Sequence, residues 1–223
     1  DMNDVVVVVS VDRRSDKETG KVELIRINWE LKAAGAAHLN AFAVQLDKVR
    51  ASEVAGVETT NTTFGRGAFA GPESGSELAV IPLFNTSQEI LGEGTYINTT
   101  KGVAIPTVKH TTTVTFAQPV DPAAVRESAL NAFIVVNQKS SGTFTREKEI
   151  HIPGRKPTQF AVVSGNTFLE SDPYRYFVPG EFRYPLERSD IRDVYTYFNA
   201  WAASGGREHV EWYRDEADET LLY

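Results

Sequence analysis

Three oxygen-bearing side chains stand at the start of the sequence, immediately before a run of valines. Asp1, Asn3 and Asp4 offer carboxylate and amide oxygens, the hard ligands that calcium prefers. An EF-hand loop is excluded, because no glycine stands at the sixth position and valines fill the rest of the loop. One turn cannot supply about six to eight oxygens, so other loops, such as those of Asn85 or Asn98, would have to contribute. We predict a calcium site at this turn; the alternative is an Asx turn that hydrogen-bonds its own backbone.

Other catalytic or metal-binding patterns are missing from the sequence. The four histidines show no HExxH motif or close pairing, so we expect no zinc site, and His151 is expected to be a hydrogen-bonded structural residue. No serine stands in a Gly-x-Ser-x-Gly elbow, and the absence of cysteine excludes thiol nucleophiles and disulfides. The 30 acidic residues make some facing pair of carboxylates inevitable, so they do not identify a glycosidase. We expect no enzyme, and the alternative is a carbohydrate-active one.

Aromatic side chains near the C-terminus could form a sugar-stacking platform. Trp201 lies on the apolar stripe of a predicted helix, so we expect it to pack in the core. Trp212 and Tyr213 lie in a highly charged tail, and we predict that this pair is exposed. Tyr174 and Tyr176 offer further rings for such a platform.

Strand signals dominate the first two thirds of the sequence. Residues alternate between apolar and polar from Lys21 to Leu31, which is typical of a half-buried antiparallel strand. The run Val5–Val9 is apolar on both faces and predicts a central, fully covered strand. Many short strands separated by turn signals predict a mainly β fold, an antiparallel β-sandwich or jelly roll. The further predicted strands are Ala41–Leu46, Val57–Phe64, Leu78–Phe84, Val108–Phe116, Ala132–Val136 and Glu147–Ile152.

One amphipathic helix is predicted near the C-terminus. Ser189 or Asp190 can cap its start, and Gly205-Gly206 can end it. Its apolar side chains recur every three or four residues, so we expect the helix to pack on the sheets. The members of this stripe are Ile191, Val194, Tyr195, Phe198, Trp201 and Ala202.

The domain organisation follows from the same signals. An aromatic strap, Tyr174 to Pro185, precedes the helix and carries several rings between prolines. Because we find no internal repeat and no long linker, we expect a single domain over residues 1–223. The strap and the helix, about 174–213, are expected to be integral to it.

The amino-acid composition excludes some classes of binding partner. Hydrophobic residues make up 41% and charged residues 24%, ordinary values for a globular protein. The net charge is −7 and no Lys/Arg cluster is present, so we expect no binding to nucleic acid or to anionic membranes. No apolar run approaches the ~20 residues of a membrane-spanning helix. Because the sequence begins at Asp1, we expect a processed or truncated chain.

Several segments together resemble the LruC-type C-terminal domain, a family of bacterial exported proteins with no established activity. The sequence departs from the family at Ala132, where proline is usual, and it lacks the acidic residues expected before Asp1. The resemblance implies an envelope or extracellular location in Gram-negative bacteria, often at the end of a longer protein, and no reaction. The matching segments, in chain order, are Asp1 to Val6, Gly35 to Val44, Phe84 to Thr86, Ile97 to Thr99, Asn131 to Asn137, Glu149 to Gly154, Pro179 to Pro185, Ile191 to Gly206, and Trp212-Tyr213.

These observations predict a non-catalytic, exported β-sandwich module for surface binding, adhesion or assembly, stabilised by calcium if the N-terminal site forms. Its expected partners are a protein or glycan at the cell surface, or further copies of the chain. A carbohydrate-active enzyme is one alternative. The other is a structural subunit that self-associates through its N-terminal strand, since Val5–Val9 begins almost at the first residue. The expected location is extracellular, periplasmic or at the outer membrane.

Overall fold

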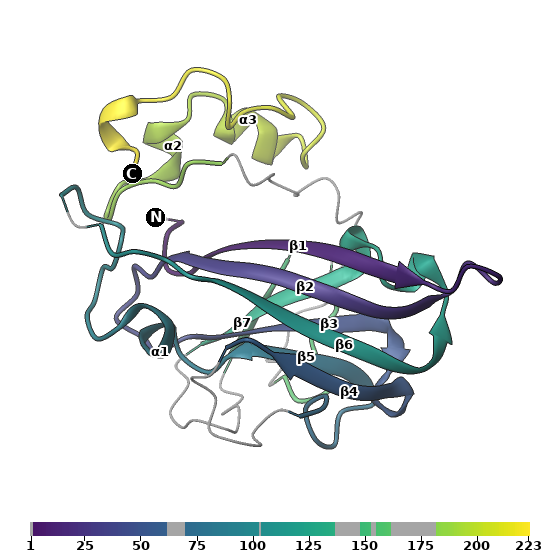
Figure 1. The fold of residues 1–223 in the computed structure, drawn as a ribbon. Coiled ribbons are helices and arrows are strands. Elements are labelled where there is room, and N and C mark those ends of the chain that lie inside the picture. Colours follow the sequence, from purple (N-terminus) through teal and green to yellow (C-terminus); the bar gives the residue numbers. More distant parts are fainter. Residues whose placement is uncertain (1, 62–69, 103, 137–147, 153–154, 162–181) are drawn as a thin grey trace.

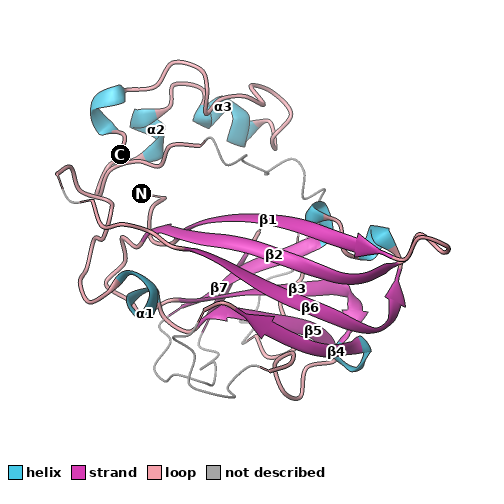
Figure 2. Ribbon diagram, in the orientation of Figure 1, coloured by secondary structure: helices cyan, strands magenta, loops and turns pink. Residues whose placement is uncertain are grey.

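The computed structural model describes residues 2–61, 70–102, 104–136, 148–152, 155–161 and 182–223 (Figure 2). Each strand predicted from the sequence overlaps an observed one, although residues 62–64 of the predicted Val57–Phe64 strand lie outside the described residues. The strands are β1 (Val6–Ser15), β2 (Val22–Ala33), β3 (Ala41–Arg50), β4 (Val54–Thr59), β5 (Leu78–Phe84), β6 (Lys109–Val120), β7 (Leu130–Val136) and β8 (Lys148–His151). The α-helices are α1 (Ser87–Leu91), α2 (Ile191–Val194) and α3 (Phe198–Ala203), and 3-10 turns occupy Ala51–Glu53, Pro122–Ala124, Glu127–Ala129 and Glu219–Leu221.

Two four-stranded antiparallel sheets pack face to face, in the orders β1-β2-β6-β4 and β5-β3-β7-β8 (Figure 1). Side chains alternate along β2, so that Ile25, Ile27 and Trp29 point into the core between the sheets. Trp29 reaches Phe84 of the other sheet, with ring centroids 5.6 Å apart. The predicted mainly β, antiparallel architecture is confirmed, and the jelly-roll connectivity stays a prediction.

The N-terminal valine run forms an edge strand, so the prediction of a central, fully covered strand is wrong. Among the described strands, β1 pairs with β2 alone. Val7, Val9 and Val11 pack against the core, whereas Val8 points the other way and is 36% exposed. Successive side chains of a strand point to opposite faces, and β1 has one covered face, so every second valine turns outward. An apolar run alone therefore did not indicate two covered faces.

The strand that is covered on both faces is β3. Its residues Ala41 to Leu46 are all buried. Val44 and Leu46 face the core between the sheets, while Ala41 and Ala43 join a second apolar cluster on the other face, around Phe133. Within the second sheet, β3 is thus an interior strand, whereas the edge strand β8 has exposed residues such as Ile150.

The C-terminal segment forms two short helices where the sequence predicts one. As predicted, the Asp190 carboxylate caps the start of α2, and Gly205-Gly206 follow α3 with positive φ angles. Between the helices, Tyr195 adopts an extended backbone and bridges Ala217. Aromatic and β-branched residues favour a helix only weakly. The extended Tyr195 instead places its ring against Trp212, with centroids 5.0 Å apart.

The apolar side chains of these helices do not pack on the sheets, which corrects the second part of that prediction. They form a separate cluster within residues 182–223, which we call the C-terminal lobe. Figure 1 shows α2 and α3 set apart from the sheets, on the side of β1. Most of the predicted aromatic strap lies outside the described residues. The buried members of the lobe's cluster are Ile191, Val194, Tyr195, Trp212 and Leu222.

None of the helices within the described residues has both the length and the apolar character needed to cross a membrane.

Candidate functional site

The structure describes two of the three predicted N-terminal ligands, and these two differ in burial. Asp1 lies outside the described residues, and the Asp4 side chain is exposed. Asn3, by contrast, is fully buried, and its Nδ2 donates a hydrogen bond to the Pro185 carbonyl over 3.1 Å. Within the described ranges, no group of three His, Cys, Asp or Glu side chains is placed to hold a metal. Asn3 therefore points away from the turn and toward a distant part of the chain.

That distant part is residues 185–188, which we call the docking segment. The backbone N–H of Glu187 donates to the Thr99 carbonyl over 2.8 Å, tying the segment to the loop between α1 and β6. The N–H of Leu186 donates to the Leu221 carbonyl, also over 2.8 Å. Together with the hydrogen bond from Asn3 to Pro185, these contacts bring three parts of the chain to one place. These parts are the first residues, the loop between α1 and β6, which we call the central loop, and the last residues. Figure 1 accordingly shows the two chain ends near one another.

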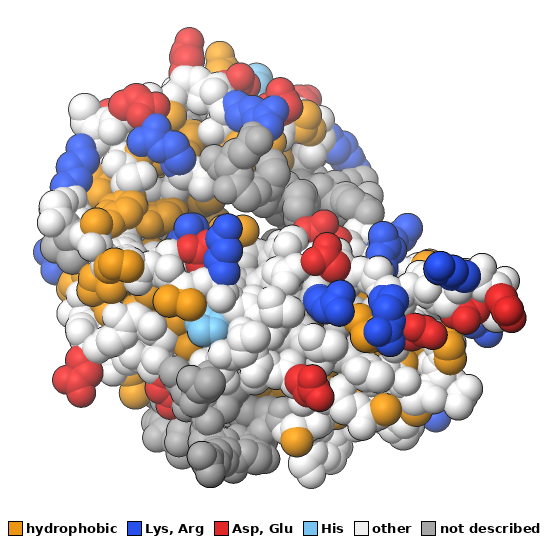
Figure 3. All heavy atoms as spheres, viewed as in Figure 1, with side chains coloured by type: hydrophobic (Ala, Val, Ile, Leu, Met, Phe, Trp, Pro, Cys, Tyr) orange, Lys and Arg blue, Asp and Glu red, His pale blue; other side chains and the backbone are white. Residues whose placement is uncertain are grey.

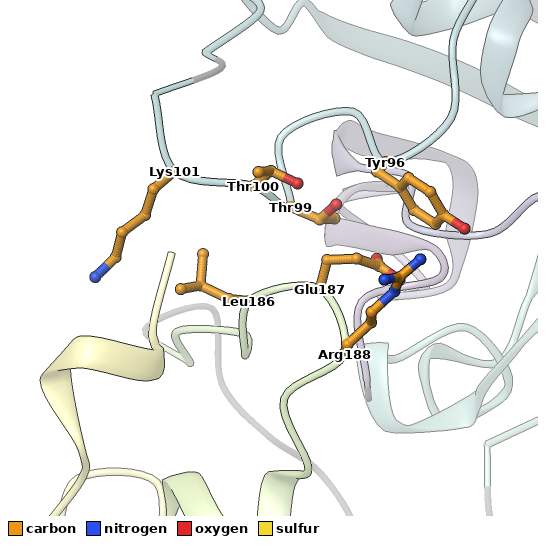
Figure 4. Close-up of a pocket in the computed structure, with 7 residues that line it drawn as sticks. All are labelled: Tyr96, Thr99, Thr100, Lys101, Leu186, Glu187 and Arg188. Carbon is orange, nitrogen blue, oxygen red and sulfur yellow. The ribbon is translucent and has the colours of Figure 1, made fainter.

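A pocket of about 410 Å³ opens where the docking segment meets the central loop (Figure 4). In Figure 4, Glu187 and Arg188 extend from the docking segment toward the loop that carries Tyr96 and Thr99. The lining combines an aromatic ring, two hydroxyls, an aliphatic chain and charges of both signs. Its members are Tyr96, Thr99, Thr100, Lys101, Leu186, Glu187 and Arg188.

The backbone around this pocket is held in conformations that side chains rarely adopt. Tyr96 and Arg188, which line it, have φ angles of 63° and 64°, and Asn98 on the same loop has 56°. These angles lie in the left-handed region, which costs free energy for residues other than glycine and recurs at functional sites. The Asn98 side chain stabilises the loop, because its Nδ2 donates to the Lys32 and Ile105 carbonyls and its Oδ1 accepts from the Ile105 N–H. Asn98 is thus a structural residue of the site.

Three buried oxygens around the pocket have no hydrogen-bond partner among the described residues. They are Asn3 Oδ1, Thr99 Oγ1 and Glu187 Oε2. A methyl group added to Gly35 would overlap Asn3 Oδ1 and would lie 2.9 Å from Glu187 Oε2, so both oxygens face the α-carbon of Gly35. Gly35 permits this approach because it has no side chain. Buried acceptors normally receive hydrogen bonds. The two oxygens that face Gly35 therefore need a binding partner.

Lys101 and Tyr184, near the pocket, both contact the last residues of the sequence. Lys101 Nζ donates to the Thr220 carbonyl over 2.7 Å, so its ammonium holds the end of the chain. Tyr184 stacks on Tyr223 with centroids 5.3 Å apart. Burial raises the pKa of Tyr184 well above its ordinary value, and the neighbouring Tyr223 adds to the rise. Tyr184 therefore stays a neutral phenol at physiological pH.

The sequence matches a known family, and the fold resembles a solved structure. Residues 20–213 match the family described as "Domain of unknown function (DUF4842)". The chain belongs to this family. One solved structure that the DUF4842 chain resembles is that of a "Putative lipoprotein from Bacteroides ovatus": the TM-score is 0.63 at 16% sequence identity, covering 99% of this chain and 69% of that one. At that identity the likeness shows the fold alone. No curated protein matches the sequence.

Elsewhere in this DUF4842 domain, the predicted aromatic platform is not formed as expected. Trp212 is 1% exposed and lies at the centre of the C-terminal lobe, so the prediction of an exposed Trp212–Tyr213 pair is wrong. The charged tail misled the prediction, because its charged residues stay exposed while the Trp212 ring turns inward onto other aromatic rings. Trp201 packs against the same cluster rather than on the sheets. Tyr174 and Tyr176 lie outside the described residues.

His151 is hydrogen-bonded on both sides, as expected of a structural histidine. Its Nδ1 lies 2.7 Å from Asn131 Oδ1 and its Nε2 lies 2.8 Å from Glu149 Oε2. The Asn131 Nδ2 donates to Asp47 Oδ1, which fixes Oδ1 as the atom that faces the ring. Both ring nitrogens thus face side-chain oxygens, and the Glu149 carboxylate lies within ion-pair distance of the ring. The side chains of this pair are 7% and 1% exposed, so they serve the interior rather than the pocket.

Asn85, the other loop residue expected to contribute oxygens to an ion site, is buried beside α1 rather than at the pocket lining. Burial raises the pKa of the nearby Glu89, with the Thr86 N–H and the Asn85 amide opposing the rise.

The sequence analysis did not identify Glu187 and Gly35 as members of the site. Only Gly35, within the Gly35 to Val44 segment, carried a signal.

Proposed function

We propose that this DUF4842 domain is a non-catalytic β-sandwich module of the bacterial cell envelope that binds a glycan in the pocket between its sandwich and its C-terminal lobe. Two further points support an exported, surface location. The solved structure of similar fold is named as a lipoprotein, and the sequence resembles the exported LruC-type domain. Adhesion or assembly at the surface would follow from such binding.

The observation that carries the proposal is the lining of the pocket. Tyr96 offers an aromatic face, and Thr100, Glu187 and Arg188 offer hydroxyl, carboxylate and guanidinium groups around it. Sugars present apolar ring faces together with hydroxyls that donate and accept, so both kinds of group are needed in one place. The left-handed backbone at Tyr96 and Arg188 indicates that the loop and the docking segment are built to hold these side chains there.

The same lining favours binding over hydrolysis. Glycoside hydrolysis generally requires two carboxylates flanking the scissile bond, about 5–10 Å apart. Among the described residues that line the pocket, Glu187 supplies the single carboxylate. One carboxylate can accept hydrogen bonds from sugar hydroxyls, but it cannot also supply the second carboxyl group that the mechanism needs as nucleophile or base.

Removal of the Tyr96 ring is expected to weaken glycan binding at least tenfold, about 1.4 kcal/mol. Asparagine is the suitable replacement, because it tolerates the left-handed backbone that alanine would strain. The measurement is a glycan array with the wild type, Tyr96→Asn and Tyr96→Phe, followed by titration of the tightest glycan. The matched control, Tyr96→Phe, keeps the ring and should bind within about threefold of the wild type. Equal binding by wild type and Tyr96→Asn, or no glycan bound by the wild type, would contradict the proposal.

A second candidate function, self-association, rests on a different observation. Among the described strands, β1 has one edge whose backbone groups are available for pairing, and Val8 is exposed beside it. Figure 3 shows charged side chains of both signs scattered over the outer face of the sheet, so the strand edge rather than the face would make the contact. Charged residues at Asp12 and Arg14 mark the far half of the strand and oppose indiscriminate pairing.

If β1 pairs with a second copy, sedimentation should give a mass above that of the 24.6 kDa monomer. Val8→Lys should then return the protein to a monomer, because an added charge on an edge strand opposes strand addition. Glu18→Lys, in the exposed turn after β1, is a control that adds a lysine off the strand and should leave the mass unchanged. A wild type that sediments as a monomer at the highest concentration measured would exclude this candidate.

A further inference from the structure

We propose that the unpaired oxygens of Asn3 and Glu187 beside Gly35, together with the unpaired hydroxyl of Thr99 on the adjoining loop, bind a divalent cation, calcium in the first place, that fastens the docking segment to the start of β1. The ligands would be Asn3 Oδ1, Thr99 Oγ1 and Glu187 Oε2. The site does not depend on the proposed glycan binding. It retains Asn3 from the N-terminal turn and replaces the aspartates of that turn with groups from two distant parts of the chain.

The geometry brings these ligands from three separate segments to one place. Asn3 and Glu187 both direct an oxygen at the α-carbon of Gly35, the latter 2.9 Å from where a side chain would begin. Thr99 is tied to Glu187 by the 2.8 Å backbone hydrogen bond and lines the same pocket. Asn3 and Thr99 are both fully buried. Within the described part of the chain, the Thr99 hydroxyl is therefore a buried polar group without a partner, on the residue whose carbonyl accepts from the Glu187 N–H.

The chemistry of the three oxygens points to a cation. The amide and carboxylate oxygens only accept hydrogen bonds, and the hydroxyl can turn its lone pairs to the same point. A carboxylate oxygen removed from water needs a compensating charge or donor. Hard oxygen ligands in an irregular arrangement suit calcium, which accepts variable geometry, better than magnesium, which demands a near-ideal octahedron. Thr99 and Glu187 also line the adjoining pocket, from which water can reach the ion and complete its coordination.

Such a cation would have a structural consequence. Asn3 precedes β1 by a few residues, and its Nδ2 already holds the docking segment through Pro185. A bound ion would add a second connection at the same point and give the buried Glu187 Oε2 a partner. The C-terminal lobe would then be more firmly attached to the sandwich with the ion than without it.

The test is thermal unfolding of the full chain with calcium chloride and with EDTA. For the wild type we expect calcium at about 100 times its dissociation constant to raise the melting temperature by roughly 5–10 °C relative to EDTA. Titration calorimetry should give one bound calcium per chain. In Glu187→Gln the calcium effect should vanish, while the melting temperature in EDTA should equal or exceed that of the wild type. The side-chain amide introduced by this substitution can donate to Asn3 Oδ1, which satisfies both groups without an ion.

The control is Glu216→Gln, which makes the same chemical change at an exposed position of the same lobe and should keep the full calcium effect. A wild type whose melting temperature and heat of titration do not respond to calcium would overturn the proposal and indicate a shared proton or water between Asn3 and Glu187. A calcium shift that survives in Glu187→Gln would also overturn it, because the ion would then bind elsewhere.

Discussion

Replacement of Trp212 by alanine is expected to lower the free energy of unfolding by about 3–5 kcal/mol. The ring is 1% exposed and is the centre of the C-terminal lobe. Five aromatic rings surround it with centroid distances between 5.0 and 5.9 Å. Alanine would leave a cavity that these large neighbours cannot close. For a chain of this size the melting temperature should fall by roughly 6–20 °C. Those five neighbours are Phe182, Tyr195, Phe198, Trp201 and Tyr213.

The matched control for this change is Trp201→Ala. Trp201 packs at the border of the same cluster and is only partly buried, so the same truncation should cost clearly less. Urea unfolding followed by tryptophan fluorescence and by far-ultraviolet circular dichroism gives the free energies. Coincident transitions are expected, because hydrogen bonds donated by Asn3 and Lys101, and one accepted by the Thr99 carbonyl, join the lobe to the sandwich. Equal costs for the two variants would contradict the central position of Trp212.

Replacement of His151 by leucine is expected to destabilise the protein by about 3–5 kcal/mol, the cost of removing one member of a buried ion pair. Glu149 accepts hydrogen bonds from the Thr158 N–H and hydroxyl as well as from the ring, and its side chain is 1% exposed. Leucine would fill the space of the ring against Phe133, which stacks on it at 4.5 Å, but could not hydrogen-bond the carboxylate. The buried carboxylate would then lose its contact with the ring nitrogen.

A double-mutant cycle distinguishes charge from packing. If the pair is ionic, His151→Leu and Glu149→Leu together should cost less than the sum of the two single changes, because the double variant buries no unmatched charge. Nitrogen NMR of the wild-type ring should show both nitrogens of His151 protonated. Additive costs, or a ring with one unprotonated nitrogen, would contradict the ion-pair account.

The strands were predictable because their pattern is local. Alternation along β2 fixed which side chains face the core, and the same period governs β1. What the sequence could not show is which strand lies at an edge, since that depends on partners far along the chain. The valines of β1 and the apolar residues of β3 look alike in sequence, yet only β3 is covered on both faces. Likewise, the stripe from Ile191 to Ala202 was real, but the tail around Trp212 covers it instead of the sheets.

The site was only half predictable for the same reason. Asn3 stood out by type, because an amide before a strand suggests an oxygen ligand. Glu187 lies 184 positions later, and no local pattern distinguishes it from the other acidic residues. Gly35 carried a signal, since a glycine between two buried segments indicates close approach of another group. The left-handed backbone of Tyr96 and Arg188 arises from the fit of loop and docking segment, which only the folded chain defines.

The central claim is that the pocket between the sandwich and the C-terminal lobe is the ligand-binding site. The most direct measurement is a proton–nitrogen NMR titration of the wild-type chain with the tightest glycan from the array. The backbone amides of residues 96–101 and 186–188 should shift first and most, with smaller changes at Gly35. Shifts confined to the outer face of the first sheet or to β1, with the pocket amides unchanged, would contradict the account.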